Sequence, residues 1–382
     1  MENPLTASEI LATLRSELKA TLIERDEVID GCLLALLARQ HVLLLGPPGT
    51  AKSMLTRELC RRLDGNYFEW LLTKFTTPEE LFGPVSLPAL EEGRYERITT
   101  HKLPQAEVAF LDEIFKSNSA ILNALLTLLN ERTFYHGDSA ERVPLETLIG
   151  ASNELPDEDE LSALYDRFIL RFTVDYVQDD QRFKAMMTLD NQADLPVTTL
   201  PKEALETLRT ACDAVKVDRS IIAELTELRR TLNSKGVIAS DRRYRQSLAV
   251  LKAAALIDDR AVVDHRDLTW LEHILWTEPQ ERTTVLQTLS ELNAGLDEEV
   301  RKLVRQAKEI GNYARRSWPS RAEADRALLE AHSKLGEIQR RLDALQEEAR
   351  ERGRDAAKLE HDKQTVSDVQ RDLLASEGTW QS

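Results

Sequence analysis

Strand-like and helix-like patterns alternate along the amino-terminal half of the chain. Residues 7–40 carry apolar positions at helical spacing, which predicts two helices before the first strand. Short apolar runs with the lengths of buried strands follow at 41–45, 67–72, 107–113, 148–153 and 169–174. Helical patterns separate these runs, at 54–60, 77–82, 119–132 and 163–168. We therefore expect the strands of this part of the chain to be connected by helices.

Two further segments have the pattern of β-hairpins. Residues 85–103 place short apolar stretches on either side of a turn at 91–94. A short helix precedes this segment, with Thr77 as its expected cap and Pro78 in its first position. Residues 133–145 also turn back on themselves, directly after the helix 119–132. We expect the first hairpin to be inserted in a helix and the second to follow one.

The carboxyl-terminal half is helical. Residues 179–276 have helical patterns and few strand signals. Between residues 280 and 377, apolar residues recur at alternating spacings of four and three, the heptad pattern of packed helices. Breaks at 318–320 and near Gly353 divide this tail into three segments. We predict three helices folded antiparallel; an intermolecular coiled coil is the alternative, and the short breaks favour the local bundle.

The strongest chemical motif follows the first predicted strand. It reads Gly46-Pro47-Pro48-Gly49-Thr50-Ala51-Lys52-Ser53, and Met54 continues into the next helix. A strand, a glycine-containing loop and a helix that opens on Lys-Ser form the context of a phosphate-binding loop. Backbone N–H groups and the helix N-terminus bind phosphate oxygens there, Lys52 reaches the β- and γ-phosphates, and Ser53 ligates Mg²⁺. The alternative is a plain strand–turn–helix corner, which the spacing of Lys52 and Ser53 disfavours.

Ala51 departs from the usual form of this motif, which has glycine directly before the lysine. Alanine carries a methyl group that penalises positive φ angles. We therefore expect the loop to keep Ala51 in an ordinary backbone region.

Asp112 and Glu113 end the third predicted strand and are the second candidate part of an ATPase site. Asp112 would hold the Mg²⁺ shell, and Glu113 would orient and polarise the attacking water. Acidic residues often begin the loop after a strand, so this signal is weak alone. Its position about 60 residues beyond Lys52 and Ser53 leaves room for the intervening strands and helices and strengthens it.

Four more polar residues are candidates with an ordinary alternative each. Asn153 ends the fourth predicted strand and would hold the attacking water from the side opposite Glu113, or else simply form a turn. Arg167 follows a short helix and has the alternative of a cation at a helix C-terminus. Arg242 and Arg243 open a helix that Ser240 caps, where they would reach a phosphate or form a solvated basic face.

Composition narrows the classes of function. The chain has 382 residues and a formal net charge of -16, a length that suits about two or three domains. The negative charge argues against broad nucleic-acid binding, which requires basic surface. Three widely spaced cysteines, Cys32, Cys60 and Cys212, fit neither a metal site nor a disulfide framework, which favours a cytoplasmic location. The sequence has no transmembrane pattern and no signal-peptide pattern.

The motifs taken in order resemble those of the MoxR family of AAA+ ATPases. They are the segments 46–53, 110–113, 123–131 with its hairpin, 151–156 and 164–168. The resemblance covers roughly residues 7–276, and within the family the RavA-type subgroup (regulatory ATPases) is the most similar, since alanine before the lysine is usual there. The ordered set of motifs is far more specific than any one of them.

The resemblance implies an α/β fold, a doubly wound parallel sheet with strand order 5-1-4-3-2, followed by an all-helical lid and the helical tail. We expect a nucleotide-binding core at 1–178, a lid at 179–279 and a carboxyl-terminal three-helix domain at 280–382. The family also implies a ring, usually a hexamer, with ATP bound at each subunit interface. The hairpin segments around 91–97 and 134–141 match the inserts that line the pore of such rings.

The family also implies roles for single residues. Lys52 and Ser53 match the Walker A motif and Asp112 and Glu113 match Walker B, with ATP or ADP and Mg²⁺ as cofactors. Asn153 matches the sensor that detects the γ-phosphate. The remaining matches are Arg167 as the arginine finger that completes a neighbour's site, and Arg242, or in its place Arg243, as the sensor of the lid.

Three functions follow as hypotheses. The first is a Mg²⁺-dependent ATP hydrolase that works as a chaperone-like remodeller with a partner containing a von Willebrand factor A domain. The second is a nucleotide-switched assembly scaffold with incidental turnover, against which Glu113 argues. The third is a DNA-remodelling motor, which the net charge of -16 disfavours. RavA-type proteins also carry a β-rich module within the three-helix domain, and because the tail has no strand-like run we expect that module to be missing or minimal.

Overall fold

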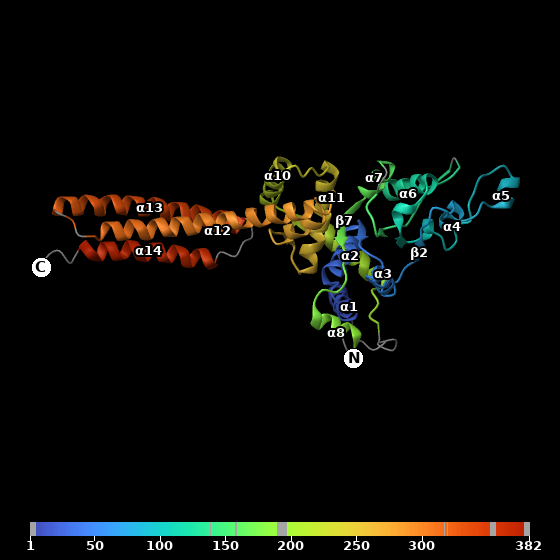
Figure 1. Ribbon diagram of the computed structural model, residues 1–382, viewed down its shortest axis with the longest axis horizontal. Helices are drawn as coiled ribbons and strands as arrows, with labels where there is room; N and C mark the ends of the chain where they lie inside the picture. The colour runs from blue at the N-terminus through green and yellow to red at the C-terminus, as the bar shows by residue number, and fades with distance from the viewer. Residues whose placement is uncertain are drawn as a thin grey trace. The chain divides into compact units, whose positions relative to one another are not determined.

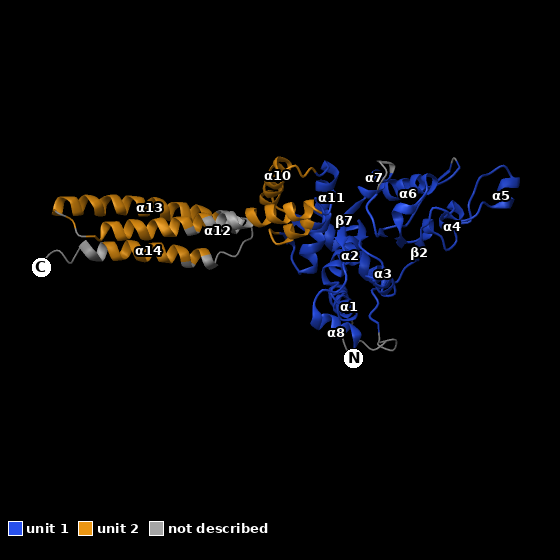
Figure 2. Ribbon diagram, viewed as in Figure 1, with its two compact units in different colours: residues 1–216, 239–263, 273–279 blue, residues 217–238, 264–272, 280–382 orange. Residues whose placement is uncertain are grey.

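A computed structural model describes residues 5–137, 139–156, 159–188, 197–316, 318, 320–351 and 357–377. The chain divides into two compact units (Figure 2). The first unit comprises residues 1–216, 239–263 and 273–279, and the second comprises residues 217–238, 264–272 and 280–382. The division into domains at 178 and 279 stays a prediction. No helix among the described residues combines the length and the apolar character needed to cross a bilayer.

A five-stranded parallel sheet forms the centre of the first unit as described. Its order is β2-β3-β6-β1-β7, which confirms the expected order 5-1-4-3-2 read from the other edge. Strand β1 is buried along its whole length, as expected for a parallel strand covered on both faces. The strands are β1 (His41–Leu45), β2 (Tyr67–Leu71), β3 (Val108–Asp112), β6 (Thr147–Ser152) and β7 (Phe168–Thr173).

Helices cover the sheet and connect its strands (Figure 1). Helix α1 begins at a capping box in which Thr6 and Glu9 satisfy each other's backbone N–H groups. Helix α2 is buried almost throughout, because it packs against α1, α9 and α11 as well as the sheet. The helices of this unit are α1 (Ala7–Thr21), α2 (Asp26–Ala38), α3 (Lys52–Cys60), α6 (Ser119–Glu131), α7 (Asp159–Tyr165), α8 (Asp180–Met187), α9 (Lys202–Ala214) and α11 (Asp241–Ile257).

The first predicted hairpin is corrected to a loop around a short helix. The segment after α4 (Pro78–Phe82) closes through one isolated antiparallel bridge between Val85 and Arg97, and α5 (Leu87–Glu91) lies between them. Pro88 near the start of α5 favours a helical turn over a strand there. The expected cap of α4 is confirmed, since Thr77 forms a capping box with Glu80.

The second hairpin is confirmed by β4 (Thr133–His136) and β5 (Ser139–Arg142), which pair antiparallel. It contacts the α5 segment directly, because the Arg97 N–H donates to Nδ1 of His136 over 3.2 Å. The rings of Phe82 and Phe134 stack 5.5 Å apart beneath this contact. The two inserts are therefore joined to one another by both polar and apolar contacts.

The second unit contains helix α10 (Arg219–Ser234) and the three long helices of the tail. The tail helices α12 (Glu281–Ala314), α13 (Arg321–Glu351) and α14 (Ala357–Glu377) each contact the other two and run side by side (Figure 1). The heptad positions form one apolar core, which includes Val300, Leu335 and Val366. This confirms the three-helix bundle. The predicted break at Gly353 lies outside the described residues, and the described residues of 281–377 contain no strand.

The remaining elements are short. They are β8 (Lys216–Val217), β9 (Val262–Val263), η1 (Leu103–Gln105), η2 (Ile114–Lys116) and η3 (Asp267–His273). Of these, η2 matters for the site, because it begins directly after Glu113.

Candidate active site at the carboxyl edge of the sheet

The loop 46–53 connects β1 to α3 at the carboxyl edge of the parallel sheet. Gly46 has φ 156°, and a Cβ atom there would lie 2.1 Å from the carbonyl oxygen of Val174, so only glycine allows the close approach. Gly49 has φ 79°, a conformation that also favours glycine. The loop therefore folds tightly against the end of β7 and opens on the N-terminus of α3, where backbone N–H groups attract anions.

Ala51 differs from the sequence-based expectation. It lies in the left-handed region, with φ 65° and ψ 22°, directly before the first residue of α3. The expectation of an ordinary backbone region for this alanine was wrong. A left-handed conformation costs an L-residue about 1–2 kcal/mol. The turn into α3 nevertheless requires the left-handed conformation. Alanine in place of glycine therefore strains the loop but does not change its path.

Lys52 is almost fully buried, and its side chain folds back over the loop. Its Nζ donates to the carbonyl oxygens of Gly46 (2.7 Å) and Pro47 (2.9 Å) and to Oδ1 of Asn153 (3.3 Å). Burial lowers the pKa of Lys52 below its ordinary value, and the carboxylates of Asp112 and Glu113 partly offset this. The ammonium group is thus held at the mouth of the loop.

Asp112 ends β3 and Glu113 follows it, and Asp112 contacts the start of α3. Oδ2 of Asp112 accepts a hydrogen bond from the Ser53 hydroxyl over 3.2 Å, and its Oδ1 accepts from the Glu113 N–H over 3.0 Å. Hydroxyl and carboxylate oxygens are ligands that suit Mg²⁺, so this pair fits the predicted metal site. Glu113 itself has φ 53°, a left-handed conformation that is uncommon for a non-glycine residue.

Asn153 joins the two halves of the site. Its Nδ2 donates to Oε1 of Glu113 over 2.5 Å, while its Oδ1 accepts from Lys52. An amide nitrogen has two hydrogens, so one remains for a further acceptor. The structure thus brings together five of the predicted site residues, Lys52, Ser53, Asp112, Glu113 and Asn153. The strand order explains why these residues lie together, because β3, β6 and β1 are consecutive in the sheet and end at the same edge.

Arg167 lies at the opposite edge. It precedes β7, whose first residue Phe168 is opposite His41, whereas Thr173 at the far end is opposite Leu45. A strand rises about 3.3 Å per residue, so some 16 Å of β7 separate Arg167 from the loop of its own chain. Arg167 is half-buried, its Nε has no hydrogen-bond partner, and it forms no ion pair with any described residue.

Arg243 does not reach the loop either, which corrects its expected place as a phosphate ligand of its own chain. Its guanidinium donates to the carbonyl oxygens of Phe168 (2.9 Å), Ile169 (2.8 Å) and Ile274 (2.8 Å) and lies 3.3 Å from Oδ1 of Asp166. It is 2% exposed. Since Ile169 lies at the amino end of β7, about 13 Å of strand separate it from the loop. Arg243 acts here as an anchor of α11 on β7.

Arg242 lies at the same edge and is half-buried. Its Nη1 and Nη2 donate to Oδ1 of Asn130, each over 3.3 Å, and its Nε donates to Gln246. The structure therefore places neither arginine beside Lys52 of the same chain.

Two residues that the sequence motifs did not single out contact the loop, and a third, Glu24, holds the segment that follows Tyr176. Arg25 is buried and donates to the carbonyl oxygens of Thr50 (3.2 Å) and Asp175 (2.6 Å). The Tyr176 hydroxyl donates to the Pro48 carbonyl over 3.2 Å. Glu24, in a left-handed turn, accepts the N–H groups of residues 178 and 179. Nothing local in the sequence predicts these long-range contacts.

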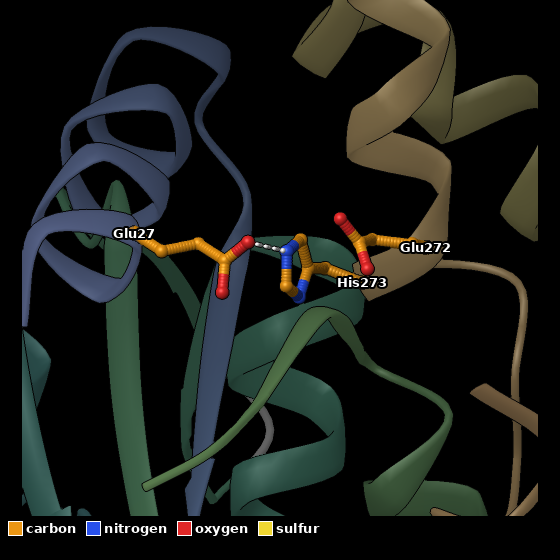
Figure 3. Close-up of side chains that lie close together, drawn as sticks. All are labelled: Glu27, Glu272 and His273. Atoms are coloured by element: carbon orange, nitrogen blue, oxygen red, sulfur yellow. Dashed lines mark ion pairs between the residues drawn. The ribbon is translucent and has the colours of Figure 1, made fainter. Parts of the chain in front are cut away.

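A separate contact joins α2 to the segment that follows α11. Oε1 of Glu27 lies 2.9 Å from Nε2 of His273 (Figure 3). The His273 ring also packs on Phe172 of β7, with centroids 4.4 Å apart. Nearby, the guanidinium of Arg171 donates to the Trp276 carbonyl and lies over the Tyr165 ring. These contacts fix the segment 273–279 on β7.

Comparisons with known proteins agree with this architecture. Residues 9–210 match a family described as the MoxR domain in the MoxR-vWA-beta-propeller ternary systems, and residues 220–289 match the AAA lid domain. An uncharacterized protein of Methanocaldococcus jannaschii is 43% identical over 274 residues, which cover 71% of this chain and 73% of that protein. Chaperone MoxR1 of Mycobacterium tuberculosis is 25% identical over 169 residues, 43% of this chain and 44% of MoxR1.

The fold has a solved counterpart as well. The crystal structure of a proposed ATPase from Cytophaga hutchinsonii superposes with a TM-score of 0.61 at 18% identity, covering 75% of this chain and 94% of that one. At this identity the likeness concerns the fold. With the family match over more than half of its length and the shared parallel sheet and lid, the chain belongs to the MoxR family of AAA+ ATPases.

Proposed function

We propose that this chain is a Mg²⁺-dependent ATP hydrolase that works as a ring-shaped, chaperone-like remodeller of other protein complexes. The observation that carries the proposal is the convergence of Lys52, Asn153 and Glu113 in one hydrogen-bonded row, with Ser53 and Asp112 paired beside it. A cation, an amide donor and a carboxylate in this order are what hydrolysis of a phosphoanhydride requires.

Each residue has a separate task in the proposed reaction. Lys52 leaves the loop carbonyls to bind the β- and γ-phosphate oxygens, together with the backbone N–H groups of Gly49 to Ser53. Ser53 and Asp112 would hold Mg²⁺, which supplies positive charge against the phosphate oxygens. Glu113 accepts the proton of the attacking water, and the second amide hydrogen of Asn153 binds the γ-phosphate.

The position of Arg167 supports assembly of several copies of the chain. About 16 Å of strand lie between it and its own loop, so it can contact a γ-phosphate only in another copy of the chain. Its Nε lacks a hydrogen-bond partner and no described residue pairs with it, as suits a cation that acts across an interface. We assign it as an arginine finger in a ring, with a hexamer as the expected number of subunits. Such fingers contribute about a thousandfold or more in rate.

The partner assignment rests on relatives. The matched family is named for systems that combine a MoxR domain with a vWA protein and a β-propeller, and one relative is named a chaperone. We therefore propose a von Willebrand factor A domain protein as partner and a cytoplasmic protein complex as client. The RavA-type subgroup remains a proposal that rests on Ala51 and on the three-helix tail.

The experiment uses full-length Glu113→Gln protein, which should bind ATP without hydrolysing it. Light scattering with and without ATP and Mg²⁺ measures the mass, and phosphate release measures turnover in the wild type. We expect a shift to about six subunits with nucleotide and no turnover by the variant. Lys52→Ala is the control that should lose nucleotide binding.

A Glu113→Gln protein that turns over as fast as the wild type would show that another residue is the base. A wild-type protein that assembles on ATP without releasing phosphate would favour the scaffold instead. Normal ATP affinity of Lys52→Ala would contradict the assignment of the loop.

A further inference from the structure

The carboxylate of Glu113 has a second partner besides Asn153. Nζ of Lys116 lies 3.2 Å from Oε2, while Nδ2 of Asn153 donates to Oε1. Lys116 ends the short helix η2 that starts just after Glu113, and its own N–H donates to the Glu113 carbonyl over 2.8 Å. The two oxygens of Glu113 are therefore held by two different groups.

The surroundings of the two residues differ. The Glu113 side chain is 15% exposed and that of Lys116 is 51% exposed. The ammonium group thus belongs to an exposed side chain, whereas Asn153, which also accepts from Lys52, links the carboxylate to the loop. One oxygen of the carboxylate thus accepts a hydrogen bond from Asn153, and the other lies in an ion pair with Lys116, so both oxygens have a polar partner.

We propose that Lys116 is a positioning residue for the base Glu113; the proposal rests on the function proposed above. A base must present a lone pair to the attacking water at a defined angle, and errors of about 1 Å cost rate. Asn153 also serves Lys52 and, in the proposed reaction, the γ-phosphate, so its contact with Glu113 changes as nucleotide binds. Lys116 belongs to the same turn as Glu113 and holds Oε2 throughout.

The alternative is an ordinary surface ion pair. Pairs of exposed residues three positions apart usually contribute little to stability. A positioning residue can be distinguished from such an ion pair by kinetics. Its loss slows the chemical step and leaves nucleotide affinity and folding stability unchanged.

The test compares three full-length variants. Lys116→Met removes the ammonium and keeps the length of the side chain, Lys116→Arg keeps a donor and the charge, and Lys308→Met removes an exposed lysine of α12 as a matched control. Steady-state phosphate release gives kcat and KM, binding of a fluorescent ATP analogue gives Kd, and thermal unfolding reports folding. We expect Lys116→Met to lower kcat about fivefold with KM, Kd and Tm unchanged. Lys116→Arg and Lys308→Met should keep kcat within twofold of the wild type.

A double-mutant cycle locates the effect. If Lys116 acts through Glu113, adding Lys116→Met to Glu113→Gln lowers the residual rate no further than Glu113→Gln alone. An unchanged kcat for Lys116→Met, a loss that Arg does not restore, or a further loss in the double variant would each overturn the proposal. Equal turnover of the wild type and Glu113→Gln would instead overturn the base itself, and with it the role of Lys116.

Discussion

Replacing Arg243 by methionine tests whether this arginine anchors the fold or binds a phosphate. The buried guanidinium donates to the carbonyl oxygens of Phe168, Ile169 and Ile274 and pairs with Asp166. Methionine fills much of the space and removes the guanidinium donor from all of these acceptors. Arg243→Met therefore removes the anchor without leaving a large cavity.

The expected loss is large. Leaving a buried acceptor unsatisfied costs about 1–3 kcal/mol, and three buried carbonyl oxygens lose the Arg243 donor; the Asp166 side chain is 38% exposed, so its ion pair adds little. Burial also lowers the pKa of Arg243, which indicates that the folded protein bears a desolvation cost that methionine removes. We therefore expect a net loss of about 3–5 kcal/mol, or a Tm lower by about 6–20 °C for a unit of this size.

Arg242→Met is the matched control, because it removes the same group from the neighbouring position. Arg242 is half-buried and bonds only to the side chains of Asn130 and Gln246 among the described residues. We expect its loss to cost under about 1 kcal/mol.

Calorimetry measures Tm for both variants. Binding of a fluorescent ATP analogue measures affinity at about 20 °C, which is about 25 °C or more below the typical melting temperature of a domain. An Arg243→Met protein with wild-type Tm and weakened ATP binding would refute the anchor and restore the sensor assignment.

Three further predictions concern strain, assembly and acid. Ala51→Gly should raise stability by up to about 1 kcal/mol, because it relieves the left-handed conformation at the cost of unfolded-chain entropy; urea unfolding measures this, and a lower midpoint would contradict it. Arg167→Ala should be inactive alone yet regain activity when mixed with Glu113→Gln, because mixed rings pair an intact site with an intact finger; phosphate release across mixing ratios tests this. Burial lowers the pKa of His41 from 6.5 to about 3 in the folded protein. As the pH falls below about 6.5, His41 therefore takes up a proton in the unfolded chain but not in the folded one, and the free energy of unfolding decreases. Denaturation at pH 7 and pH 5 should show about 2 kcal/mol of this loss in the wild type and little of it in His41→Gln.

Local patterns were sufficient for the sheet and for the centre of the site. The strands are short apolar runs, and the site residues lie at or directly after the carboxyl ends of β3 and β6. Because the strands are parallel, these ends lie at the same edge of the sheet. The position of Asn153 at the end of a predicted strand also indicated that it lies at this edge, although asparagine by itself is more typical of a turn. These predictions succeeded because each depends on residues close in sequence and on a sheet order that the family motifs supplied.

Contacts between distant residues could not be predicted in the same way. Arg242 and Arg243 are adjacent at a helix start, and sequence alone does not tell which one turns toward β7 and becomes buried. Arg25 and Tyr176 reach the loop from segments far away in the chain. The prediction for Ala51 was wrong for another reason. It relied on the preference of alanine for negative φ, whereas the turn into α3 imposes the left-handed conformation.

The two edges of the sheet divide the proposed reaction between two copies of the chain. The carboxyl edge holds Lys52, Asp112, Glu113 and Asn153, so in the proposed reaction one chain would supply the groups that bind ATP and activate water. Arg167 lies at the amino edge, and because β7 is paired with β1 between them, we expect no side-chain movement to close the roughly 16 Å from Arg167 to the loop. Binding and hydrolysis should therefore be separable: a monomer should bind ATP, and rapid turnover should require a second copy whose amino edge faces the loop.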